Sequence, residues 1–137
     1  MNKFLASPIK KVALAHFKKG KMLQVRTSSQ EQVFYTLGGK YEPGEDDYAC
    51  IKREVKEEVN CEVIEKSVKF LKEFEDENDE GGVLNIRLYK GELIGEPKPS
   101  SEIVEIGWFD SNSDPKNLSL IAKRTIFPWL KMHGYIN

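Results

Sequence analysis

A glycine pair followed by an acidic helix is the sequence feature that most restricts how this chain can fold. Gly38 and Gly39 end a short apolar segment, and a proline-containing loop follows them. Apolar residues then recur at spacings of three and four, which predicts an amphipathic helix over residues 46–59. We expect Asn60 to end this helix, because asparagine tolerates the left-handed conformation. The apolar positions of the helix are Tyr48, Ile51, Val55 and Val59.

Three glutamates, Glu54, Glu57 and Glu58, share one face of this predicted helix, within an arc of about 100°. Like charges at these spacings repel, so helix stability does not account for them. A bound divalent cation would account for this arrangement, because hard cations bind several oxygen ligands that converge from one side. A solvated acidic face is the commoner arrangement for such a cluster. The neighbouring glycines favour a cation site over a solvated face, since Gly38 and Gly39 can bring backbone carbonyl and N–H groups close to a ligand.

Elsewhere, apolar residues alternate with polar ones, as they do in half-buried strands. The strands predicted in this way cover residues 11–17, 22–26, 33–37, 61–74, 83–93 and 103–109. Residues 18–21 are a plausible hairpin turn. Residues 118–132 form a second predicted helix, kinked or restarted near Pro128, which lacks a backbone donor. Strands before and after one helix, with a second helix at the end, predict an α+β fold in which helices cover both faces of a mixed sheet.

Charge and composition bear on the partners of the chain. A formal net charge of −1 gives no electrostatic reason to expect a nucleic-acid polymer or an anionic membrane as partner. No apolar run is long enough for a signal peptide or a membrane span, so we expect a cytoplasmic protein. Cys50 and Cys61 are expected to be reduced thiols in or near the core. Residues 76–81 mimic half of an EF-hand loop, but Arg87 stands where that loop needs glutamate, so we expect a solvated hairpin tip there.

The region around the acidic helix resembles the signature of the MutT-like Nudix hydrolase family. That signature is glycine, five residues, glutamate, seven residues, Arg-Glu, an aliphatic residue, one residue, Glu-Glu, one residue, glycine and an aliphatic residue. The matching positions are Gly39, Glu45, Arg53, Glu54, Val55, Glu57 and Glu58, with every spacing intact. Asn60 and Cys61 replace the final glycine and aliphatic residue, and Leu37 stands where many members have proline. Residues 102–110 also look like the strand that closes many Nudix domains.

The resemblance implies one Nudix hydrolase domain over residues 1–137, with a mixed β-sheet sandwiched between helices (α/β/α). It also implies bound Mg²⁺ or Mn²⁺, which would neutralise diphosphate charge and activate a water. The implied metal ligands are the carbonyl of Gly38 and the carboxylates of Glu54, Glu57 and Glu58. Arg53 should orient carboxylates through its forked donors, Glu54 above all, and Glu45 should support the cluster. The general base stays open between a helix glutamate and an acid outside the motif, for which Glu102 is the candidate.

Five residues are candidates for contact with the substrate: Arg26, Tyr35, Gly39, Lys40 and Glu102. Arg26 could meet a phosphate, although an arginine near the end of a strand more often faces water. Tyr35, or its neighbour Phe34, could stack on a base, although core packing is the commoner role for an aromatic residue at this position.

We expect the substrate to be a small nucleotide-like diphosphate, most plausibly an intact or oxidised nucleoside triphosphate cleaved to monophosphate and pyrophosphate. ADP-ribose-cleaving relatives often carry a proline beyond the signature, whereas no proline occurs here between Pro43 and Pro97. ADP-ribose, dinucleoside polyphosphates and sugar nucleotides remain alternatives, as does a non-catalytic module that binds a nucleotide. The sequence leaves open whether the chain forms a homodimer.

Overall fold

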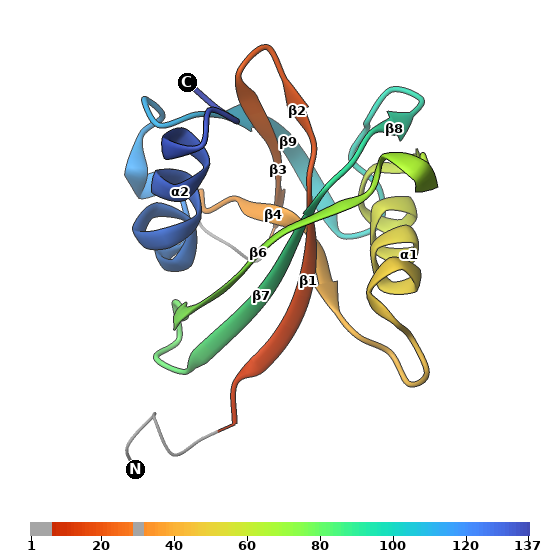
Figure 1. Ribbon diagram of the computed structural model, residues 1–137, viewed down its shortest axis with the longest axis horizontal. Coiled ribbons are helices and arrows are strands. Elements are labelled where there is room, and N and C mark those ends of the chain that lie inside the picture. The colour runs from red at the N-terminus through yellow and green to blue at the C-terminus, as the bar shows by residue number, and fades with distance from the viewer. Residues whose placement is uncertain (1–6, 29–31) are drawn as a thin grey trace.

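A mixed β-sheet divides the molecule into two helical layers (Figure 1). The structure is a computed structural model, and it describes residues 7–28 and 32–137. In chain order the elements are β1 (Ile9–Ala15), β2 (Phe17–Lys18), β3 (Lys21–Thr27), β4 (Tyr35–Lys40), α1 (Asp47–Val59), β5 (Glu62–Val63), β6 (Lys69–Glu77), β7 (Val83–Lys90), β8 (Leu93–Ile94), β9 (Ile103–Phe109), a π-helical segment (Ala122–Ile126) and α2 (Phe127–Met132). The layered α+β architecture predicted from the sequence is confirmed.

The main sheet has the strand order β2-β3-β4-β1-β7-β6, and β9 pairs with β3. Its strands pair antiparallel except β1 and β7, which run parallel. β3 and β4 pair only at Gln24↔Thr36 and Val25↔Tyr35, and the rest of β4 pairs with β1. The glycine pair therefore lies within β4, opposite Val12 and Ala13, and the strand continues to Lys40.

Two hydrophobic clusters hold the layers together, one on each face of the sheet. α1 lies on one side of the sheet and α2 on the other (Figure 1). α1 contributes the fully buried side chains Ile51, Val55 and Val59 to the first cluster. Residues Ile126 and Leu130 of the C-terminal helical region contribute to the second. Burial of each such aliphatic side chain stabilises the fold by about 1.5–3 kcal/mol, so both helices are firmly held against the sheet.

Side chains at its two ends fix the boundaries of α1. The Asp46 carboxylate accepts a hydrogen bond of 2.8 Å from the backbone N–H of Ala49, which caps the first turn. Asn60 adopts the left-handed conformation (φ 56°, ψ 39°), and its N–H donates to the carbonyl of Lys56. The predicted helix over residues 46–59 and its termination at Asn60 are confirmed.

The strand predicted over residues 61–74 is wrong. β5 and β6 are separate, and a 3-10 turn at Glu65–Ser67 lies between them. In this turn the Ser67 hydroxyl donates to the carbonyl of Ile64 at 2.6 Å. The turn separates strands of two different sheets, because β5 pairs with β8 in a small two-stranded sheet, whereas β6 pairs with β7 in the main sheet. The strand predicted over residues 83–93 likewise ends at Lys90, and β8 pairs with β5 instead of the main sheet.

The C-terminal helical region begins two residues later than predicted, because Leu118 forms a β-bridge with Phe34. Asp79, at the β6–β7 tip, accepts a hydrogen bond of 3.1 Å from the N–H of Leu120 and caps the first turn. The distortion expected near Pro128 takes the form of a π-helical segment, in which the N–H of Phe127 donates to the carbonyl of Ala122. Within residues 7–28 and 32–137, no helix is both long and apolar enough to cross a membrane.

Candidate active site

The glycine pair allows α1 to approach β4 closely. Gly38 has φ +143°, and a β-carbon there would lie 2.2 Å from the carbonyl oxygen of Val12 on β1. A β-carbon on Gly39 would lie 2.7 Å from the carboxyl carbon of Glu54 on α1. Only glycine therefore allows both the β1–β4 pairing and the contact between this strand and the acidic face of the helix.

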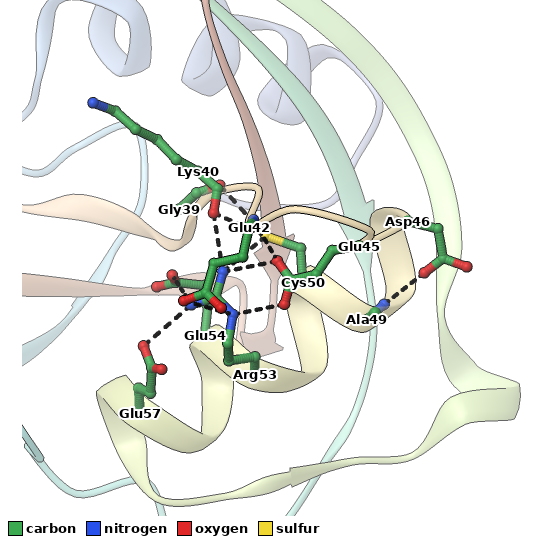
Figure 2. A network of polar contacts seen from close by, with 10 residues as sticks. All are labelled: Gly39, Lys40, Glu42, Glu45, Asp46, Ala49, Cys50, Arg53, Glu54 and Glu57. Carbon is green, nitrogen blue, oxygen red and sulfur yellow. Dashed lines mark hydrogen bonds and ion pairs between the residues drawn. The ribbon is translucent and has the colours of Figure 1, made fainter.

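Arg53 is the centre of the polar network at this contact (Figure 2). Its Nε and Nη2 donate to the two carboxylate oxygens of Glu45, at 2.7 and 2.9 Å. Its Nη1 donates to Glu54 Oε1 at 2.7 Å and to Glu57 Oε2 at 3.3 Å. Nη2 also reaches the carbonyl of Lys40, at 3.0 Å. This planar, bidentate arrangement needs a guanidinium group, and lysine could not reproduce it.

The carboxylates of the site have pKa values that differ because their surroundings differ. Hydrogen bonds from Arg53, followed by that from the backbone of Glu42, lower the pKa of Glu45 to about 2. Burial raises the pKa of Glu58 to about 8, although a hydrogen bond of 2.9 Å from the N–H of Gly38 works in the opposite direction. Burial also raises the pKa of Glu54. Glu54 and Glu58 thus lie where a negative charge lacks sufficient protein partners.

The oxygen donors of this site fit a hard divalent cation such as Mg²⁺ or Mn²⁺. The carboxylates of Glu54 and Glu58 are disfavoured as anions by burial, and a bound cation would reverse that effect. Glu57 instead contacts Arg53, and its side chain is 49% exposed. Consequently, within the described residues, no three acidic, histidine or cysteine side chains converge in an arrangement that could hold a metal ion. Glu57 would have to leave Arg53 to join the other two glutamates.

A cavity of about 380 Å³ has one of the motif carboxylates, Glu58, in its lining. Its lining also includes Gly38, Gly39, residues 78–80 of the β6–β7 tip, and Ser119. Tyr35 lies in its wall, where burial, followed by the charges of Asp79 and Glu80, raises the pKa of the phenol to about 12. The remaining lining residues are Ile9, Lys11, Val12, Ala13, Val25, Thr27, Thr36, Lys40, Leu84, Ile86, Ile103 and Ile121. Glu58 therefore belongs both to the acidic face of α1 and to the lining of a pocket large enough for a small molecule.

The structure brings some of the predicted substrate-binding residues to this cavity. Tyr35, Gly39 and Lys40 line it. Arg26 does not, because its Nε donates to Glu105 at 2.9 Å while Val25 and Thr27, its neighbours on β3, face the cavity. The remaining candidate, Glu102, is exposed, and its charge helps to raise the pKa values of both Glu54 and Glu58.

Sequence reasoning missed several cavity residues: Lys11, Asn78, Asp79, Glu80 and Ser119. Asn78–Glu80 were predicted only as part of a solvated hairpin tip. They do lie at the β6–β7 tip, but Asn78 is buried there, so the prediction of a solvated residue is wrong at this position. One feature of the sequence could have identified Lys11 as a cavity residue, since it is a charged residue at the start of an apolar strand. The sequence could not decide whether Lys10 or Lys11 faces inward.

Comparisons with known proteins identify the family and agree with the fold. A family model described as the NUDIX domain matches residues 12–130. A MutT Nudix hydrolase from Burkholderia pseudomallei has 19% identity and a TM-score of 0.74, over 90% of this chain and 98% of that one. A MutT protein from Methanosarcina mazei Go1 has 20% identity and a TM-score of 0.74, over 92% and 95% of the two chains. The E. coli ORF135 protein has 19% identity and a TM-score of 0.72, over 95% and 94%. No curated protein matches the sequence.

Proposed function

This chain belongs to the Nudix family and is a diphosphate hydrolase, and we propose that it cleaves a nucleoside triphosphate, intact or oxidised, to a nucleoside monophosphate and pyrophosphate. We further propose that residues 1–137 act as one Nudix domain and that the reaction requires Mg²⁺ or Mn²⁺. The observation that carries the proposal is that Glu58, a partly buried carboxylate on the acidic face of α1, also lines the pocket.

The proposed metal site uses the carbonyl of Gly38 and the carboxylates of Glu54, Glu57 and Glu58. A cation bound there would neutralise diphosphate charge and lower the pKa of a bound water. For Glu57 to take part, it must give up a 3.3 Å contact with Arg53 at a partly exposed position. Exposed ion pairs of this kind contribute about 1 kcal/mol or less, so cation binding could easily overcome that contact.

Arg53 is proposed to position the site. It holds Glu54 on one side and Glu45 on the other, so that the loop before α1 and the helix itself are fixed relative to β4. The proton acceptor is proposed to be a glutamate on the acidic face of α1. Glu102 is the alternative outside the helix, and its charge already acts on Glu54 and Glu58.

The cavity favours a substrate with one nucleoside. Its volume of about 380 Å³ lies near the lower end of the usual range for small-molecule sites, roughly 300–1,000 Å³. Dinucleoside polyphosphates and ADP-ribose carry a second ribosyl group, for which such a pocket offers little enclosed space. The aromatic wall at Tyr35 and the polar groups at Asn78 and Ser119 suit a heterocyclic base, which has both an apolar face and polar edges.

The test is a turnover screen of nucleoside triphosphates, ADP-ribose, dinucleoside polyphosphates and sugar nucleotides, with Mg²⁺ or Mn²⁺. We expect pyrophosphate release from a nucleoside triphosphate that stops when the metal is chelated. Glu57→Gln should lower kcat by at least about 10²-fold while the melting temperature stays within a few degrees, because the side chain is half-exposed. Lys56→Gln, a neighbouring exposed substitution, is the matched control and should leave kcat unchanged. A folded Glu57→Gln enzyme with normal turnover would exclude Glu57 from the site.

A further inference from the structure

Lys11 lies in the wall of the active-site cavity without an ion-pair partner among residues 7–28 and 32–137. It is partly buried on β1, where it pairs in register with Lys40 on β4. Residues directly opposite each other on antiparallel strands project from the same face, so the two side chains share the cavity face of the sheet. The fold thus places two positive charges together in a cavity whose lining also holds Glu58 and Glu80.

This position is costly for a lysine. Burial lowers the pKa of Lys11, the charge of Lys40 lowers it further, and the attraction of Glu80, Glu58 and Glu54 only partly opposes this. A partly buried charge that lacks a close partner destabilises the folded state. Strand pairing does not require it, because the backbone groups that pair β1 with β4 are the same for any non-proline residue at this position. The ammonium group of Lys11 therefore does not contribute to the stability of the fold.

We propose that Lys11 binds a non-bridging phosphoryl oxygen of the substrate. This inference rests on the proposed function, since it takes the cavity as the site of a nucleotide. Lys11 lines the same cavity as Glu58 and Glu80, and the charges of both carboxylates act on it. A phosphorylated ligand that occupies this cavity therefore meets the ammonium group in its wall. A compact ammonium with three donors suits a phosphoryl group.

Lys11→Met tests the proposal, because methionine keeps most of the length of the side chain and removes the charge. A charged hydrogen bond contributes enough affinity to predict an increase in KM of about 10- to 100-fold, with kcat changed by only a few-fold. The melting temperature should stay the same or rise, since a partly buried unpaired charge is removed. Lys10→Met is the matched control, because Lys10 is exposed at the adjacent position of the same strand, and it should leave KM unchanged.

Two outcomes would overturn the proposal. One is an unchanged KM in Lys11→Met. The other is a fall in melting temperature with an equal loss of activity in both variants, which would indicate a structural role. Lys11→Arg restores the charge and should recover part of the affinity, which a purely structural role would not predict.

A direct binding measurement tests the proposal for Lys11 independently of the proposed hydrolysis of a nucleotide. The probe is inorganic tripolyphosphate, titrated by calorimetry into wild type and Lys11→Met with Ca²⁺ as the cation. Weaker binding to Lys11→Met supports the inference even if wild type hydrolyses no nucleotide, in which case only the proposed function fails. Equal binding to both proteins, or no binding to wild type, overturns the inference even if wild type hydrolyses nucleotides normally.

Discussion

Substitution of Gly39 by alanine should impair catalysis far more than stability. The backbone of Gly39 does not require a positive φ, so alanine introduces no conformational strain there. Its β-carbon would, however, lie 2.7 Å from Cδ of Glu54 and 2.8 Å from both carboxylate oxygens. Ordinary contacts between non-bonded carbons are about 3.5–4.0 Å long, so the carboxylate must move by roughly 1 Å.

The expected losses of stability and of kcat in Gly39→Ala depend on which atoms of Glu54 have to move. They lie at the end of a flexible side chain, so the fold can adapt at a cost of about 1 kcal/mol or less, which corresponds to a melting temperature lower by about 4 °C at most. A misplacement of about 1 Å in a reacting site, by contrast, can reduce the rate by about 10²-fold. We therefore expect kcat of Gly39→Ala to fall by roughly this factor in a pyrophosphate-release assay, with a nearly normal thermal unfolding curve.

A double-mutant cycle shows whether Glu54 is the cause. Glu54→Asp shortens the side chain and removes the overlap with the new β-carbon. In that background Gly39→Ala should cost much less activity than it does in wild type, so the two effects should be non-additive. Full activity of Gly39→Ala, or additive effects in the double variant, would refute the reasoning that the glycine is required for the position of Glu54.

The remaining predictions concern stability. The folded-state pKa of Glu45 is held at about 2, below its ordinary value of 4.5, so its contribution is complete above pH 4.5 and is lost as the pH falls towards 2. Glu45→Gln should flatten that part of the curve of urea midpoint against pH, and an unchanged curve would argue against the Arg53 contact. Asn60 has φ 56°, so Asn60→Gly should raise the free energy of unfolding by up to about 1 kcal/mol. Asn60→Ala should lower it, and the reverse order in urea unfolding would contradict the left-handed cap.

The acidic helix could be predicted from the sequence because its determinants are close together in the chain. The apolar repeat and the left-handed residue Asn60 both act within one or two turns, and the structure confirms them. The family followed from the spacing of Arg53, Glu54, Glu57 and Glu58, and the match of the NUDIX-domain model confirms it. Such local determinants do not depend on which distant segments pack against the helix.

The break between β5 and β6 could not be predicted in the same way. An apolar pattern shows that a residue is buried, but it does not show with which strand it pairs. β5 pairs with β8 in a separate two-stranded sheet, whereas β6 pairs with β7 in the main sheet, so the chain leaves one sheet and enters the other between them. That change of partner depends on contacts with later segments of the chain.

The sequence by itself determined the acidic helix, the glycine pair beside it and the family of the chain. Only the tertiary structure decided the composition of the pocket. A shift in strand register by one residue reverses which side chains face inward, and the pairing of β1 with both β4 and β7 selects Lys11 over Lys10. The same long-range packing pairs Arg26 with Glu105, outside the pocket, and brings Asn78 and Ser119 into it. These contacts join residues far apart in the chain, so no local pattern could encode them.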